Sequence, residues 1–207
     1  MFIKKGSRTK DKNIYSFIEW YKLNLGIRAD LVPVIEDVRL GANIELWKFE
    51  RTRGSQYLSI QKKYLEYYLG RSGLYYKEQR GDYYVSKKPI LLNQLWSREI
   101  ETGEFCGYPK CCIDDFKKYC QEFLQNRLEK GPAVLFYHKV KEAIKKGSFN
   151  MVLFYTLHIP CDLDCQKTII LAESIKSVLE SRDIEAAHYL MEYNRNLLCE
   201  FNYEYSD

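Results

Sequence analysis

Cysteine residues gather in two short segments of this chain, and their type and spacing suggest chemistry. The first segment, CGYPKCC, spans residues 106–112, and the second, HIPCDLDC, spans residues 158–165. Each segment places a proline shortly before thiols. Thiolates bind soft metal ions and attack electrophiles. The two segments offer six candidate ligands of a metal centre: Cys106, Cys111, Cys112, His158, Cys161 and Cys165.

Both segments lead into predicted helices, which would place their thiols at helix N-termini. Pro109 suits the first position of one helix, and Asp162 can cap the other, so that Cys165 falls in its first turn. A helix N-terminus carries unpaired N–H groups and a partial positive charge, which lower the pKa of a thiol and favour the thiolate. Two such N-termini facing each other would form a pocket for a thiolate-ligated centre.

The spacing of the thiols leaves the identity of the centre open. Zinc fingers and ribbons use paired cysteines about two to four residues apart, and this pattern is absent. Cys161 and Cys165 are spaced as in the radical-SAM cluster motif, but Thr168 stands where the third cysteine would be, which excludes that site. An iron–sulfur cluster held by both segments is favoured slightly over an irregular zinc site. Disulfides and thiol redox chemistry are the alternatives.

The chain has seven cysteines, and we do not expect all of them to be ligands. Cys120 lies on the apolar stripe of a predicted helix, and we interpret it and Cys199 as small hydrophobic residues. Adjacent residues point about 100° apart on a helix, so Cys111 and Cys112 cannot face one metal equally well. The preferred ligands are Cys112, Cys161 and Cys165, completed by Cys111, Cys106 or His158.

A basic, tyrosine-rich segment is a second candidate site. The sequence GLYYKEQRGDYYVSKK, residues 73–88, predicts a β-hairpin that turns at residues 80–82. Aromatic rings can stack on bases while cations hold phosphates, which would suit RNA or DNA. Tyrosines on strands are also typical of packing against the domain. The candidate nucleic-acid-binding residues are Tyr76, Lys77, Arg80, Lys87 and Lys88.

Hydrophobic periodicity predicts an α+β fold, predominantly helical with a small β-hairpin or short antiparallel sheet in the N-terminal half. We interpret residues 1–12 as a flexible basic arm and 13–207 as a single domain, with the cysteine-rich site carried by 104–180. Pro33 argues against a helix within 31–50, where NIELWKF predicts a short strand. Helices are predicted over 13–26 with Gly26 as the stop, and over 55–70, 89–100, 109–128, 132–146, 163–181 and 183–198.

Composition limits the class of protein. The chain has 207 residues, of which 46% are hydrophobic, so it can build a substantial core. No apolar run approaches the roughly 18 residues of a membrane span, and the charged start lacks the apolar stretch of a signal peptide. We therefore expect a cytoplasmic protein with no membrane partner, in which clustered thiols indicate metal binding. Basic residues dominate 51–90 and acidic residues dominate 162–207, so only the former would attract phosphate.

The motifs GYPKCCIDDF (107–116) and HIPCDLDCQKT (158–168) together resemble an uncharacterised archaeal family, the domain-of-unknown-function family 483. Its pattern is a glycine, an aromatic residue and a proline before paired cysteines and a phenylalanine, and then a His-x-Pro-Cys segment with a second cysteine. The resemblance covers about residues 104–180, implies an archaeal, cytoplasmic protein with one site built from both cysteine groups, and implies no established activity. The matching positions are Gly107, Pro109, Cys111, Cys112, Phe116, His158, Pro160, Cys161 and Cys165; Cys106 is not among them.

Taken together, these patterns predict a cytoplasmic metal-binding protein with a cysteine-ligated centre, either an iron–sulfur cluster or zinc, which is structural or serves an enzyme of unknown substrate. The alternative is a helical binding module, stabilised by zinc or disulfides, that contacts RNA or a partner protein through the basic hairpin and arm. A thiol enzyme without a metal is a third class. All versions of the metal site require that Cys112 lie close to Cys161 and Cys165.

Overall fold

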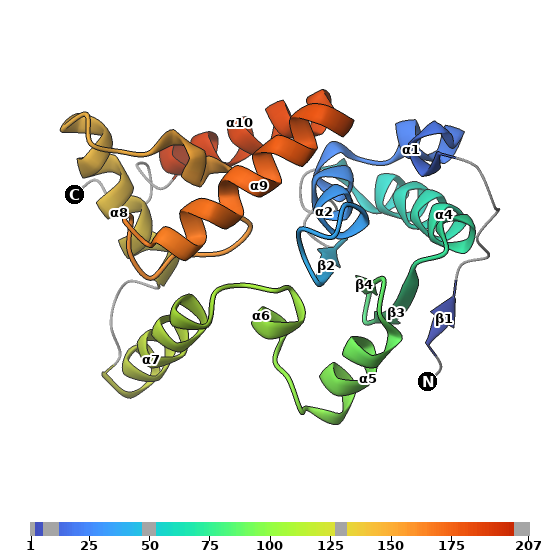
Figure 1. The fold of residues 1–207 in the computed structure, drawn as a ribbon, viewed down its shortest axis with the longest axis horizontal. Coiled ribbons are helices and arrows are strands. Elements are labelled where there is room, and N and C mark those ends of the chain that lie inside the picture. The colour runs from blue at the N-terminus through green and yellow to red at the C-terminus, as the bar shows by residue number, and fades with distance from the viewer. Residues whose placement is uncertain (1–2, 6–12, 47–52, 127–131, 201–207) are drawn as a thin grey trace.

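A four-stranded antiparallel sheet lies in the N-terminal half of the chain, and helices make up most of the rest, which confirms the predicted α+β class (Figure 1). The computed structural model describes residues 3–5, 13–46, 53–126 and 132–200. The strands are β1 (Lys4–Lys5), β2 (Gly41–Glu45), β3 (Tyr75–Gln79) and β4 (Asp82–Ser86). The helices are α1 (Ile18–Lys22), α2 (Leu25–Ile35), α4 (Ser55–Ser72), α5 (Pro89–Ser97), α6 (Thr102–Phe105), α7 (Lys110–Asn126), α8 (Pro132–Lys145), α9 (Gln166–Arg182) and α10 (Ile184–Glu200), with short 3₁₀ helices η1 (Ile14–Ser16) and η2 (Met151–Tyr155).

The sheet is built around the predicted hairpin. Strands β3 and β4 pair through a two-residue turn in which Arg80 (φ 54°) and Gly81 (φ 91°) both have positive φ, the conformation that matches the twist of a tight hairpin. Strand β2, predicted from the segment NIELWKF, pairs with β4 and gives the strand order β1-β3-β4-β2. The edge strand β1 pairs with β3 and consists of two residues assigned above to a flexible arm; residues 6–12 of that arm lie outside the described residues.

Side chains of the sheet alternate between two apolar cores. Tyr83 and Val85 face the larger core, which is completed by α1, α2, α4, η2, α9 and α10. Tyr84 faces a smaller core with Leu92 of α5 and Phe105 of α6. The period of two along β4 therefore explains why helices cover both faces of the sheet. The smaller core leads directly into the turn before α7, where the first cysteine segment lies.

The first helical region differs from the prediction of one helix over 13–26. Phe17 and Leu23 adopt extended backbone angles and break it into η1, α1 and α2. Asn24 then caps α2, because its side chain accepts a hydrogen bond from the N–H of Gly26 at 2.8 Å. Gly26 is therefore the second residue of a new helix, so its prediction as a stop was wrong.

Pro33 lies inside α2, so the prediction that this proline excludes a helix was also wrong. A proline inside a helix costs about 3 kcal/mol because it removes a backbone hydrogen bond. The other residues of α2 offset this cost through burial in the larger core, since almost the whole helix surface is covered. Fully or nearly fully buried apolar residues of α2 are Ile27, Ala29, Leu31, Val32 and Val34.

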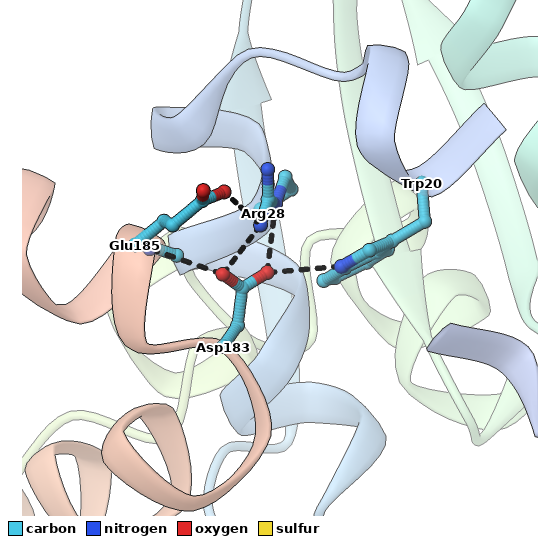
Figure 2. Close-up of polar contacts among 5 residues, drawn as sticks. Trp20, Arg28, Asp183 and Glu185 are labelled. Atoms are coloured by element: carbon cyan, nitrogen blue, oxygen red, sulfur yellow. Dashed lines mark hydrogen bonds and ion pairs between the residues drawn. The ribbon is translucent and has the colours of Figure 1, made fainter. Parts of the chain in front are cut away.

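A buried ion pair joins α2 to the turn between α9 and α10 (Figure 2). The Asp183 carboxylate accepts hydrogen bonds from Arg28 Nε at 2.7 Å, from Arg28 Nη2 and from Trp20 Nε1 at 2.9 Å. It also caps α10 by accepting from the N–H of Ala186 at 3.1 Å. The exposed carboxylate of Glu185 forms a second ion pair with Arg28, at 3.1 Å. The start of α10 and the end of α9 are thereby fixed to the N-terminal helices.

Helices α7 and α8 lie at one end of the molecule, away from the sheet (Figure 1). Helix α7 packs against α6 and α8, and Cys112 is its single buried residue among those whose side chains are described. The apolar stripe of this helix, which the sequence pattern predicts to face the core, is largely exposed to solvent, since Phe116 is 42% exposed and Leu124 is 77% exposed. Apolar burial therefore holds α7 only weakly, and its first turn is the part that is anchored.

Candidate metal centre

Two helix starts bring four cysteines together. Cys111 and Cys112 lie in the first turn of α7. This helix begins at Lys110, so Pro109 comes just before it and not at its first position as predicted, and the Pro109 carbonyl accepts the N–H of Cys112 at 2.9 Å. Cys165 is the N-cap of α9 rather than a member of its first turn, and Asp162 does not cap that helix. Instead, the carbonyl of Asp162 accepts the N–H of Cys165 at 3.2 Å, which closes a turn over residues 162–165, between Cys161 and the start of α9.

The four sulfur atoms form a compact group. Cys112 Sγ lies 3.7 Å from Cys161 Sγ and 3.8 Å from Cys165 Sγ, and Cys111 Sγ lies 3.8 Å from Cys165 Sγ. All four sulfurs lie within 4.8 Å of one another, and such a group could hold a metal ion. None of the described cysteines is in a disulfide. The predicted convergence of the two segments is therefore confirmed, and Cys111 joins the three preferred residues.

Thr168, in the first turn of α9, contacts two of these sulfurs. Its fully buried hydroxyl lies 3.1 Å from Cys112 Sγ and 3.4 Å from Cys165 Sγ. The backbone N–H of Cys161 also points to Cys112 Sγ, at 3.4 Å. Donors of this kind stabilise thiolates and orient them as ligands. Sequence reasoning did not assign a role to Thr168, although its position three residues after Cys165 could have shown that the two share a helix face.

The thiols have unequal acidities. Burial raises the pKa of Cys165, but hydrogen bonds from Thr168 and from the thiols of Cys161 and Cys111 together outweigh this and bring it to about 7. Burial raises the pKa of Cys112, and burial together with hydrogen bonding to the neighbouring sulfurs raises that of Cys161. The metal-free group therefore keeps protons that a bound metal ion would displace.

His158 lies beside the sulfur group but is not a member of it. Its Nε2 lies 3.2 Å from Thr168 Oγ1, and its ring stacks on Tyr108 with centroids 4.6 Å apart. Burial and the nearby Arg39 guanidinium lower the pKa of His158 to about 4, so the ring is neutral at physiological pH. His158 thus contacts Thr168, and its ring nitrogens are not among the candidate metal-ligand atoms.

Cys106 lies outside the sulfur group as well, because it belongs to the smaller core. It is 1% exposed, ends α6 and packs near Leu92 and Phe105. Its carbonyl accepts a hydrogen bond from Arg39 Nε at 3.3 Å, and Arg39 also donates to the hydroxyl of Tyr108 at 3.1 Å. Burial raises the pKa of the Cys106 thiol. Cys106 therefore supports the turn that leads to α7, and Cys120, halfway along α7, is also outside the group.

Comparison with protein families identifies a match to the family described as "Protein of unknown function (DUF483)" over residues 76–193, more than half of the chain. The chain belongs to the DUF483 family. The DUF483 match includes all six candidate ligand residues and extends well beyond the 104–180 range in which the resemblance was noticed. No match was found among curated proteins or solved structures.

The DUF483 match begins within the hairpin that carries the candidate nucleic-acid-binding residues. Tyr76 and Lys77 are buried, at 8% and 7% exposure, and Lys77 Nζ lies 3.9 Å from the centroid of the Trp96 ring. Burial lowers the pKa of Lys77. Lys87 is exposed and pairs with Asp37 at 2.6 Å, while Arg80 and Lys88 are exposed. The hairpin therefore does not present its aromatic and basic side chains on one open face.

None of the helices in the described part of this DUF483 protein combines the length and the apolar character that crossing a bilayer requires.

Proposed function

We propose that this protein binds a single zinc ion through Cys111, Cys112, Cys161 and Cys165. The observation that carries this proposal is the spacing of the sulfurs, with three pairs at 3.7–3.8 Å. A tetrahedral ion with metal–sulfur bonds of about 2.3 Å requires its ligand sulfurs to lie roughly 3.8 Å apart. Four thiolates fill the coordination sphere of zinc, which is typical of a structural site.

An iron–sulfur cubane, which the sequence slightly favoured, requires a wider group of ligands. Each cysteine of a cubane binds a different iron atom, so the cluster itself separates the cysteine sulfurs. Here all four sulfurs lie within 4.8 Å of one another, which supports a single ion. We also propose a cytoplasmic location, because that compartment keeps thiols reduced and available to bind an ion.

The proposed role of the ion is to fasten α7 to the body of the protein. Four thiolates around one divalent ion leave a net negative charge, and the N-termini of α7 and α9 both point their partial positive charge at it. Helix α7 has little other anchorage, since Cys112 is its only buried residue among the described side chains. The free energy of zinc binding would therefore become free energy of folding for this end of the molecule.

Elemental analysis of protein purified without oxygen tests this function. The expected result is about one zinc per chain with neither iron nor acid-labile sulfide. Cys112→Ser should abolish zinc retention, whereas the matched variant Cys120→Ser, on the same helix but outside the sulfur group, should retain it. Iron and sulfide in stoichiometric amounts would show that the site holds an iron–sulfur cluster and not zinc. Protein with four free thiols and no metal would refute metal binding at this site.

A further inference from the structure

The four sulfurs fall into two pairs that differ in their hydrogen bonding. Cys112 and Cys165 form an inner pair, which receives the Thr168 hydroxyl and, at Cys112, the N–H of Cys161. Cys111 and Cys161 form an outer pair, to which no N–H or O–H group among the described residues donates. Cys112 is 3% exposed, whereas Cys165 and both members of the outer pair are partly exposed, so hydrogen bonding and not exposure separates the two pairs.

We propose that Cys111 and Cys161 are the reactive thiolates of the centre and its sites of covalent modification by soft alkylating electrophiles, and that Thr168 is a positioning residue that protects Cys112 and Cys165. This inference rests on the proposed zinc site, because it concerns thiolates held by an ion. It adds an activity, nucleophilic capture of an alkyl group, that a purely structural site lacks.

His158 fixes the direction in which the Thr168 hydroxyl donates. Thiolates only accept hydrogen bonds, so the single hydroxyl hydrogen must point at sulfur while the oxygen accepts from His158 Nε2–H at 3.2 Å. A hydrogen bond to a thiolate withdraws electron density from sulfur and must be given up when that sulfur forms a bond to carbon. The inner pair, which shares the Thr168 hydroxyl and at Cys112 also accepts from the N–H of Cys161, is therefore less nucleophilic than the outer pair.

Cys161 also lies where an electrophile can gather. It lines a surface groove beside α7 and α8. Apolar and aromatic residues such as Phe116, Tyr119, Phe136 and Pro160 form much of its wall, and the charged side chains of Asp115, Lys139 and Asp162 also line it. In the reaction, a sulfur lone pair forms the S–C bond as the bond from carbon to its halide breaks and the halide leaves. The sulfur becomes a thioether, which is a weaker ligand than a thiolate, so the three remaining thiolates would hold a bound zinc ion.

Alkylation of the zinc-loaded, full-length protein with less than one equivalent of iodoacetamide tests the proposal, with tandem mass spectrometry to locate the label. Cys111 and Cys161 should carry most of it. Thr168→Val, which removes the hydroxyl and keeps the shape, should speed the combined labelling of Cys112 and Cys165 by up to roughly tenfold. The two sulfurs share one hydroxyl hydrogen, and one hydrogen bond of about 1.4 kcal/mol corresponds to tenfold in rate. Thr168→Ser keeps a hydroxyl and should restore the wild-type order.

Zinc content measured on each sample separates the two proposals. Zinc-loaded wild type in which Cys112 or Cys165 reacts as fast as the outer pair would overturn this inference and leave the zinc site intact. Unchanged labelling in zinc-loaded Thr168→Val would overturn the protective role of Thr168. If Thr168→Val does not retain zinc, the order in which the cysteines of the wild type and of Thr168→Ser are labelled still shows whether the outer pair is the more reactive one. Wild type without zinc would refute the proposed function itself.

Discussion

Replacing Asp183 by alanine should strongly destabilise the protein, because this carboxylate satisfies three separate groups. Among the described residues, Arg28, whose side chain is 6% exposed, would keep only Glu185, whose side chain is 68% exposed, as an acidic partner at hydrogen-bond distance. Trp20 Nε1 would lose its acceptor inside the larger core. The N-terminus of α10 would lose its cap at Ala186.

The magnitude follows from these losses. Removing one partner of a buried ion pair costs about 3–5 kcal/mol, because the other charge is left buried without compensation. Removing a helix cap costs about 1 kcal/mol. The losses share one side chain and do not add fully, so we expect Asp183→Ala to lower the free energy of unfolding by about 4–5 kcal/mol. That is a large part of the roughly 5–15 kcal/mol that stabilises a typical domain.

Urea unfolding followed by circular dichroism measures this change. Glu185→Gln is the matched control, because it removes the exposed carboxylate on the same arginine and should cost less than about 1 kcal/mol. For a chain of this size, the main variant should also lower Tm by about 10–15 °C. The reasoning would be refuted if Asp183→Ala cost no more than Glu185→Gln.

Three further predictions concern packing and pH. Gly41→Ala should cost about 1–3 kcal/mol in urea unfolding, because an added Cβ would lie 2.5 Å from Phe105 Cζ in the smaller core. Gly70→Ala, inside α4 with open space around the new Cβ, should instead stabilise the protein by about 0.5–1 kcal/mol in the same assay. Burial and the nearby Arg39 lower the pKa of His158 from an ordinary 6.5 to about 4 in the folded protein. Between pH 6.5 and pH 4, His158 is therefore protonated in the unfolded chain and neutral in the folded protein. Its stability contribution is complete above pH 6.5 and is lost toward pH 4, so the wild type should lose up to about 3 kcal/mol relative to His158→Gln over that window, measured by unfolding at each pH.

The metal-site residues could be found from the sequence because their signals are local. Two cysteine segments each precede a helix, and helix starts are marked by nearby proline and polar residues. The hairpin was predictable for the same reason, since its turn lies between two alternating strands. Cys106 looked like a ligand by proximity in sequence, but the positive φ of Gly107 (75°) turns the chain between it and α7.

Features that depend on distant contacts could not be predicted in this way. Arg28 and Asp183 are 155 residues apart, and nothing in either neighbourhood marks them as partners. Pro33 is tolerated in α2 because burial outweighs its local cost, which only the packed core reveals. Lys77 looked like a phosphate ligand, yet its place on the inner side of the hairpin puts it over Trp96. In each case tertiary packing overrides a local preference.

The buried ion pair has a consequence for how the DUF483 region can be studied. Asp183 lies within the matched residues 76–193, but Arg28 and Trp20 lie before them, as does β2, which forms the outer edge beside β4. A protein trimmed to the matched residues would keep every metal-site cysteine and still lose the counter-charge of Asp183 and one wall of the larger core. The region that matches the family is therefore shorter than the part of this chain that forms the larger core, and variants for study should keep the residues before it.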